Sequence, residues 1–145
     1  MSLTLVATPI GHIKDITLRD IESLQEADVV IGEEFREVST LLKRLKIVGK
    51  KMEVLNEHSK DEDVAALADL CAQSKVALVT DCGTPGFCDP GARLVAVCRK
   101  KGIAVTTNPG ASSLMCLLSL AGDNIKQFVF RGFLPAEREE RQRAL

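Results

Sequence analysis

The chain of 145 residues has few aromatic side chains: it contains five phenylalanines and neither tryptophan nor tyrosine. A hydrophobic core built from this composition must be mainly aliphatic. Stacking of nucleic-acid bases on exposed aromatic rings is therefore not the expected mode of recognition. Net charge is also small, because 19 basic residues nearly balance 20 acidic ones and leave −1. Bulk charge thus predicts no strongly basic face for a phosphate backbone, although a local basic patch is compatible with this balance.

Long apolar runs and cysteine motifs are absent as well. No apolar stretch reaches the roughly 18 residues of a membrane-spanning helix, and the N-terminus lacks the features of a signal peptide. The five cysteines show no C-x-x-C spacing, so the sequence predicts no metal site. Cys71 and Cys98 fall in apolar helical patterns, where buried thiols pack as small hydrophobic groups. We expect a cytoplasmic protein with reduced thiols and no membrane partner.

Short apolar runs alternate with longer amphipathic segments along most of the chain. The run at residues 76–80 is unbroken, which is typical of a parallel strand covered on both faces. Strands are predicted at 3–7, 29–31, 52–55, 76–80 and 103–106, and helices at about 15–27, 37–46, 61–73, 92–101 and 112–120. This order predicts an α/β three-layer sandwich with a five-stranded, mainly parallel sheet and right-handed crossovers.

The C-terminal part of the sequence has a different pattern. Residues 127–135 predict a sixth strand with an apolar face, and residues 136–145 predict the start of a charged helix without an apolar stripe. We therefore expect an α/β domain over residues 1–124, followed at 125–145 by the start of a second domain that is truncated or supplied by a partner. Because an uncovered apolar strand edge tends to pair, the segment around Phe128, Phe130 and Phe133 also predicts a homodimer.

Three predicted loops that follow strands are rich in glycine, proline and small hydroxyl residues: 8–11, 81–91 and 108–113. In an open parallel sheet, ligands bind beyond the carboxyl ends of the strands. Glycine lets the backbone approach a ligand, and a helix N-terminus after the third loop favours an anionic group. One such loop is usually only a turn, but three at one edge predict a small-molecule site. Neither G-x-G-x-x-G nor G-x-x-x-x-G-K-S/T occurs, so no nucleotide-phosphate motif is present.

Four motifs in the chain resemble those of the tetrapyrrole-methylase superfamily, in the same order. Residues 5–19 are similar to VATPIGNLxDITLRA, residues 80–91 to SDAGTPGISDPG, residues 108–114 to IPGPSAL, and residues 131–135 to xGFLP. They most resemble the branch that methylates the ribose 2′-hydroxyl of a cytidine in small-subunit ribosomal RNA. The resemblance implies the N-terminal domain fold of that superfamily and S-adenosylmethionine as the methyl donor. It also implies ribosomal RNA or the small ribosomal subunit as partner.

The resemblance places the family's methyl-donor contacts on the three loops. Pro9, Ile10 and Gly11 would line one side of the donor, and Ser112 and Ser113 would lie beside it at the start of the last helix of the domain. The methionine part would be held, mostly by backbone groups, by Asp81, Gly83, Thr84, Pro85, Gly86 and Phe87. Methyl transfer from a sulfonium mainly needs alignment and exclusion of water, so small residues are sufficient to hold the donor.

Two further motifs differ from the family pattern. Residues 33–42 correspond to EDTRxTxxLL and residues 56–60 to HEHNE, with changes at residues 34–35 and 59–60. Glu33, Arg36 and His58 match the family and are the candidate catalytic residues. His58 could act as a general base or be a solvated histidine that follows a strand. Arg36 could bind a phosphate or simply lie on the surface of a helix.

Three functions stay open at this point. The first is a methyltransferase of the ribosomal-RNA type, represented by its donor-binding half. The second is a methyltransferase of the same superfamily that acts on a tetrapyrrole or another small molecule, which the changes at 34–35 and 59–60 would allow. The third is a catalytically inactive chain that binds the donor or a partner protein. The third is suggested by length, because family members resemble two-domain proteins with the donor between the halves.

Overall fold

The computed structural model describes all 145 residues, and residues 1–114 and 115–145 form two compact units. The first unit holds a sheet of five parallel strands in the order β3-β2-β4-β1-β5. The strands are β1 (Ser2–Leu5), β2 (Val29–Gly32), β3 (Lys51–Val54), β4 (Lys75–Leu78) and β5 (Val105–Thr107). The connections contain a short 3-10 helix, η1 (Ile13–Asp15), and the helices α1 (Leu18–Glu26), α2 (Phe35–Arg44), α3 (Asp61–Gln73) and α4 (Gly91–Lys100).

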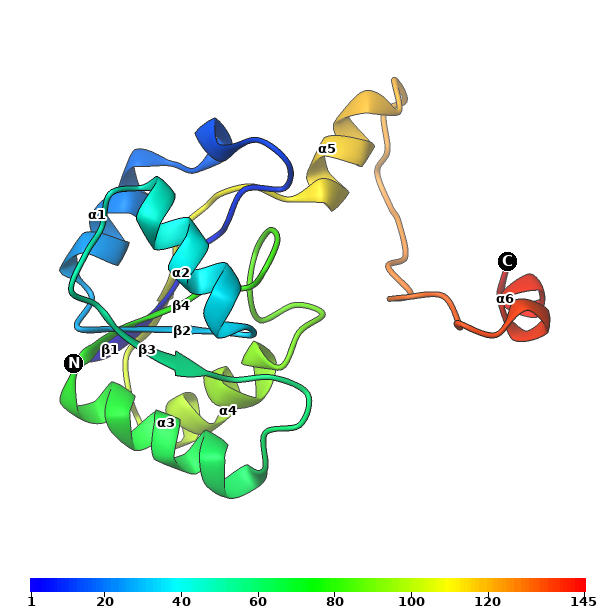
Figure 1. Cartoon of the computed structure of the whole chain (residues 1–145). Coiled ribbons are helices and arrows are strands. Elements are labelled where there is room, and N and C mark those ends of the chain that lie inside the picture. The colour runs from blue at the N-terminus through cyan, green and yellow to red at the C-terminus, as the bar shows by residue number, and fades with distance from the viewer. The chain divides into compact units, whose positions relative to one another are not determined.

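Helices cover both faces of this sheet, as Figure 1 shows. Helices α1 and α2 pack on one face while the chain moves from β1 through β2 to the edge strand β3. Helices α3 and α4 pack on the opposite face while the chain returns to β4 and then β5. The helices change from one face of the sheet to the other where the order of the strands reverses direction. This change allows all the crossover connections to have the same handedness. The predicted three-layer α/β fold is confirmed, and the sheet is entirely parallel.

Alternate residues of the central strands point to opposite faces and form two hydrophobic clusters. On β2, Val29 and Ile31 pack with α3 and α4, whereas Val30 packs with α1 and α2. Burial on both faces explains why the central strands are apolar without interruption. No aromatic residue is among the buried hydrophobic side chains, so the expected aliphatic core is confirmed. Each fully buried leucine or valine contributes roughly 1.5–3 kcal/mol.

Cys71 on α3 and Cys98 on α4 belong to this core and are fully buried. Burial, followed by the neighbouring Cys98, raises the pKa of the Cys71 thiol to about 12. Burial also raises the pKa of Cys98. Both thiols are therefore protonated near neutral pH and pack as small apolar groups, as the sequence predicted.

Helix α1 begins with a capping box, and the Asp20 side chain of this box also binds the residue that follows β5. The Thr17 hydroxyl donates to Asp20 Oδ2 at 2.6 Å and accepts from the Asp20 N–H at 3.1 Å. Asp20 is fully buried, and its second oxygen accepts from Asn108 Nδ2 at 3.1 Å. The residue after β5 is thereby tied to the start of α1.

Helices α5 (Ser113–Leu120) and α6 (Arg138–Ala144) complete the chain. Residues 127–135 form no strand, so the prediction of a sixth strand is wrong. A strand needs a neighbour for its backbone N–H and C=O groups, and residues 115–145 contain no other strand. The predicted charged helix is present as α6, capped by the Glu137 side chain, which accepts from the Glu140 N–H at 2.7 Å. No helix combines the length and the apolar character that a bilayer span requires.

Candidate functional site

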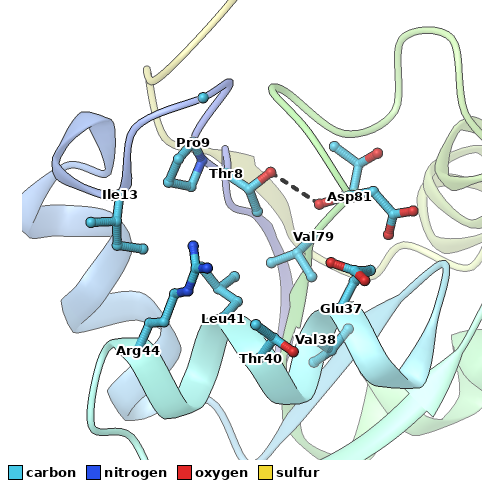
Figure 2. Close-up of a pocket in the computed structure, with 12 residues that line it drawn as sticks. Thr8, Pro9, Ile13, Glu37, Val38, Thr40, Leu41, Arg44, Val79 and Asp81 are labelled. Atoms are coloured by element: carbon cyan, nitrogen blue, oxygen red, sulfur yellow. Dashed lines mark hydrogen bonds between the residues drawn. The ribbon is translucent and has the colours of Figure 1, made fainter.

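Backbone and hydroxyl hydrogen bonds join the three glycine- and proline-rich loops at the carboxyl edge of the sheet. Thr8 and Gly83 form an antiparallel bridge, with N–H to C=O distances of 2.8 and 3.1 Å. The Thr8 hydroxyl also donates to the Thr80 carbonyl at 3.0 Å (Figure 2). The Thr84 hydroxyl donates to the Ala111 carbonyl at 3.0 Å. The loop after β4 therefore contacts both the loop after β1 and the loop after β5.

The shape of the loop after β4 depends on its glycines and on Asp89. Gly83 and Gly86 have φ angles of 88° and 82°, a left-handed conformation that favours glycine. The Asp89 carboxylate accepts N–H bonds from Gly86 at 2.7 Å, Gly91 at 2.8 Å and Phe87 at 3.3 Å. Asp89 was not among the site residues predicted from the sequence. A signal was available, since Asp side chains often bind backbone N–H groups two or three residues away in turns.

The loop after β5 is held against β1 and α1. The Asn108 N–H donates to the Leu5 carbonyl at 3.0 Å, and its side chain donates to Ser23 Oγ at 2.9 Å. At Gly110 the fit is tight, because a Cβ atom there would lie 2.5 Å from Ala7 Cβ. Glycine at this position therefore permits the close approach of the two loops.

Two hollows open at this edge within the first unit. The first, which we call the α2 hollow, has a volume of about 180 Å³ and lies between α2, the loop after β1 and the end of β4 (Figure 2). Its lining residues are Thr8, Pro9, Gly11, Ile13, Glu37, Val38, Thr40, Leu41, Arg44, Val79, Thr80 and Asp81. The second, the acidic hollow, has a volume of about 310 Å³. It is lined by Glu33, Glu34, Asn56, Glu57, His58, Asp81, Cys88, Asp89 and Pro90.

Asp81 lines both hollows and lies in an acidic environment. Burial raises the pKa of the Asp81 carboxyl, and the negative charges of Glu33, Glu37 and Glu34 raise it further. Glu33 contacts the same segment directly: it accepts from the Thr80 hydroxyl and, at 3.3 Å, from the Asp81 N–H. A cationic group placed here would relieve the repulsion between these carboxylates.

The donor-binding residues that the resemblance predicts lie in the three loops, and some of them line the α2 hollow. Pro9, Gly11 and Asp81 line that hollow. Gly83 and Thr84 carry the bonds between loops. The other predicted contacts have these positions: Ile10 is half-buried beside Gly83, Pro85 is buried, Gly86 is held by Asp89, Phe87 is exposed, Ser112 is half-buried and Ser113 begins α5.

Two of the three candidate catalytic residues come together. Glu33 and His58 both line the acidic hollow with Asp81. The His58 side chain is 85% exposed and lies 3.6 Å from Glu57. Arg36 is exposed on α2 and lines neither hollow.

The groups at this edge fit S-adenosylmethionine chemically. This donor has an ammonium and a sulfonium cation, and the carboxylates around Asp81 match a positive charge. Its carboxylate could lie at the start of α5, where helix N–H groups favour an anion. Glycine and other small residues between these points leave the backbone accessible.

Relatives of known name match almost the whole chain. Proteins named Ribosomal RNA small subunit methyltransferase I are similar to it in Leptospira biflexa serovar Patoc, Synechocystis sp. and Neisseria meningitidis serogroup B. The identities are 39%, 40% and 42%, over 99%, 99% and 98% of this chain. The same alignments cover 60%, 51% and 49% of the three relatives. The chain thus spans between about half and three fifths of their length.

Comparison with solved structures supports the fold. A crystal structure of diphthine synthase aligns with a TM-score of 0.63 and 22% identity, over 84% of this chain and 49% of that one. The family model described as Tetrapyrrole (Corrin/Porphyrin) Methylases matches residues 2–145. This match covers nearly every residue, including all three loops of the carboxyl edge. The chain belongs to the tetrapyrrole (corrin/porphyrin) methylase family.

Proposed function

We propose that the chain is the donor-binding half of an S-adenosylmethionine-dependent methyltransferase. Its acceptor in this proposal is the ribose 2′-hydroxyl of a cytidine in small-subunit ribosomal RNA. The observation that carries the proposal is the convergence of three loops at one sheet edge, joined by the Thr8–Gly83 and Thr84–Ala111 bonds. The methylase family and the name of the relatives, Ribosomal RNA small subunit methyltransferase I, support the reaction and its substrate.

In this proposal the donor is held by the loops that meet at the carboxyl edge. S-adenosylmethionine supplies an activated methyl group when it is bound. Asp81 and its acidic neighbours favour the positive charge of that molecule. The backbone from Gly83 to Phe87 holds the methionine part, with Pro9, Ile10 and Gly11 on one side and Ser112 and Ser113 on the other. Their main contribution is to fix the position of the methyl group relative to the acceptor.

The acidic hollow is the proposed position of the acceptor hydroxyl. Methylation of a hydroxyl releases its proton, and the proposed acceptor of this proton is the imidazole of His58. Glu33 is tied to Thr80 and Asp81 and would orient the same region. Arg36 is exposed on α2 away from both hollows, so we propose that it contacts RNA rather than the reacting atoms.

Proposed partners follow from the substrate and from the second unit. Because the proposed substrate is the small ribosomal subunit, the proposed location of the reaction is the cytoplasm. Phe128 and Phe133 are 54% and 87% exposed, and we propose that they pack against a second copy of the chain in a homodimer. A monomer in sedimentation equilibrium at micromolar concentrations would contradict the dimer.

A catalytically inactive, donor-binding chain is the second candidate. The observation in its favour is the open environment of His58, whose side chain is 85% exposed and whose ion-pair partner Glu57 is 84% exposed. A general base usually acts in a site from which water is excluded. This candidate predicts binding of the donor without turnover.

Two measurements separate these functions. Calorimetry with S-adenosylmethionine and S-adenosylhomocysteine tests donor binding by the 145-residue chain, and no binding at high micromolar concentrations would contradict both candidates. Transfer of a labelled methyl group to small ribosomal subunits that lack the modification then tests the reaction. Binding with transfer to these subunits supports the proposed enzyme, and binding without transfer supports the inactive chain. Transfer only to a tetrapyrrole would replace the proposed substrate.

A further inference from the structure

The α2 hollow has a polar wall that donor binding does not use. Helix α2 contributes Val38 to the lining and also Glu37, Thr40, Leu41 and Arg44. Residues three, four and seven positions apart share one face of a helix, so the last four side chains form a stripe. The separation of seven positions between Glu37 and Arg44 corresponds to about 10 Å along the helix axis. The hollow therefore has an acidic end at Glu37 and Asp81 and a basic end at Arg44, as Figure 2 shows.

Arg44 has no partner within the chain. It is the one basic residue that lines the hollow, and its guanidinium makes no hydrogen bond or ion pair. Arg93 behaves differently, because it donates to Asp61 at 2.6 Å and to the Ser59 carbonyl at 2.8 Å. In Figure 2 the Arg44 side chain extends from α2 into the hollow. A guanidinium in this position offers a planar set of donors that suits a phosphate.

The distribution of charge favours a polynucleotide over a small anion. A phosphate would be attracted by Arg44 and repelled from the far end by Glu37 and Asp81. Asp81 is assigned to the donor, but a ribose hydroxyl can donate to the Glu37 carboxylate, so a chain of alternating ribose and phosphate groups matches both ends of the stripe on α2. The opposite wall is formed by Pro9 and Gly11, which are proposed donor contacts. A nucleotide in this hollow would therefore lie next to the donor.

We propose that the α2 hollow binds the ribose-phosphate backbone of the RNA substrate, with Arg44 bound to one phosphate. This inference rests on the proposed function, because it assigns a substrate contact beside the proposed donor site. Arg44 acts as a positioning residue: it holds the RNA so that the acceptor hydroxyl reaches the carboxyl edge of the sheet.

Lys43 provides a matched control on the same helix. Both Lys43 and Arg44 lie in the last turn of α2, where a positive charge interacts favourably with the helix dipole. Only Arg44 lines the hollow, and Lys43 is exposed elsewhere on the helix. Lys43→Ala and Arg44→Ala remove the same charge and perturb the helix end similarly. A difference in RNA affinity between the two variants therefore indicates a contact made in the α2 hollow.

The test measures binding of a short fluorescein-labelled oligocytidylate by fluorescence anisotropy at several salt concentrations. Arg44→Ala is expected to weaken binding about 5- to 10-fold and to make the salt dependence shallower by about 0.7 in the log–log slope. Lys43→Ala is expected to change affinity less than about twofold, because a solvated charge outside the contact contributes little. Arg44→Lys, which keeps the charge and loses the fork of donors, should fall between Arg44→Ala and the unmodified chain.

Calorimetry with S-adenosylmethionine on the same variants separates failure of this inference from failure of the proposed function. The expected result is an unchanged donor affinity in Arg44→Ala. Equal losses of RNA affinity in Arg44→Ala and Lys43→Ala would overturn the inference, as would the absence of oligocytidylate binding by the unmodified chain. Loss of donor affinity alone in Arg44→Ala would assign the guanidinium to the donor carboxylate instead. No donor binding by the unmodified chain would overturn the proposed function itself.

Discussion

Asp81 lies between the two hollows, and its carboxyl group is close to three other acidic side chains. Burial and these charges raise its pKa, so the ionised form is disfavoured in the folded chain. Residues that bind a cation often have this property, because the repulsion is relieved only when the ligand arrives. If Asp81 contacts the donor as proposed, the chain loses stability at this residue and gains donor affinity, a trade-off found at many functional sites.

The first prediction concerns the substitution Asp81→Asn. Near neutral pH the variant should be more stable than the unmodified chain, because it removes a disfavoured charge. The folded chain holds the Asp81 proton more tightly than the unfolded chain does. The stability advantage should therefore appear as the pH rises from 3.8, the ordinary value, through the raised pKa, and should vanish below 3.8. Thermal unfolding as a function of pH measures this difference.

The same variant should bind S-adenosylmethionine about 10-fold more weakly, as expected for the loss of one charge-assisted contact. Asp123→Asn is the control, since Asp123 is an exposed residue of the second unit. If Asp81→Asn bound the donor as tightly as the unmodified chain, Asp81 would not be a donor contact.

The second prediction concerns Asp89, whose carboxylate accepts three N–H bonds in the loop after β4. Asp89→Ala should lower the free energy of unfolding by about 1–3 kcal/mol, because it leaves these N–H groups without their partner. Donor affinity should fall in parallel, because Gly86 and Phe87 lose their fixed position. Urea unfolding and calorimetry measure the two effects. Asp89→Asn keeps one acceptor oxygen and should be intermediate; a fully stable Asp89→Ala would contradict this role.

At the scale of single residues, the sequence predicted the loops better than the contacts inside them. Pro9, Gly11 and Asp81 were predicted as site residues and do line one hollow. Arg44 was not predicted, because its role depends on which face of α2 turns toward the loop after β1. The spacing of Glu37 and Arg44 could have indicated a shared face, but a sequence does not show what lies opposite that face.

At the scale of elements, the position of the loop after β5 depends on its close approach to β1. Gly110→Ala would place a Cβ atom 2.5 Å from Ala7 Cβ and 3.2 Å from an oxygen of Asp20. We predict a loss of about 1–3 kcal/mol in the free energy of unfolding, because the two loops must separate. Gly11→Ala is the control: its Cβ would meet no atom within 4 Å. Its stability should change by less than about 0.5 kcal/mol.

Chemical denaturation of the two glycine variants distinguishes tight packing from a general effect of replacing glycine. Equal stabilities for Gly110→Ala and Gly11→Ala would contradict the proposed close packing of the loop on β1. A destabilised Gly110→Ala with an unchanged Gly11→Ala would confirm it.

Periodicity identified the elements of the first unit, but it did not identify their neighbours. The apolar run at 76–80 was predicted as a parallel strand covered on both faces, and β4 does lie between β2 and β1. The full order β3-β2-β4-β1-β5 depends on pairing between distant segments, which local patterns do not encode. The same limit explains the wrong prediction at 127–135, where an alternating apolar pattern has no strand to pair with.

At the scale of the whole molecule, the fold concentrates the chemistry at one edge of one unit. Two faces of the sheet are used for burial, and the loops beyond its carboxyl ends carry the small residues and Asp81. Helix α2, which lies beside these loops, carries Glu37 and the unpaired Arg44. This arrangement is a general property of open parallel sheets, in which the strand ends are the accessible part. The proposed function assigns methyl transfer to that edge, and the charges along α2 make one end of the α2 hollow acidic and the other basic.

The central claim is that the joined loops at this edge bind the methyl donor. Its most direct test is a titration of the isotope-labelled chain with S-adenosylhomocysteine, followed by amide ¹H–¹⁵N correlation spectra. We expect shifts of the amide signals at residues 8–11, 81–87 and 110–113, with the amides of α3 unchanged. The absence of shifts at millimolar ligand, or shifts confined to residues outside these loops, would contradict it.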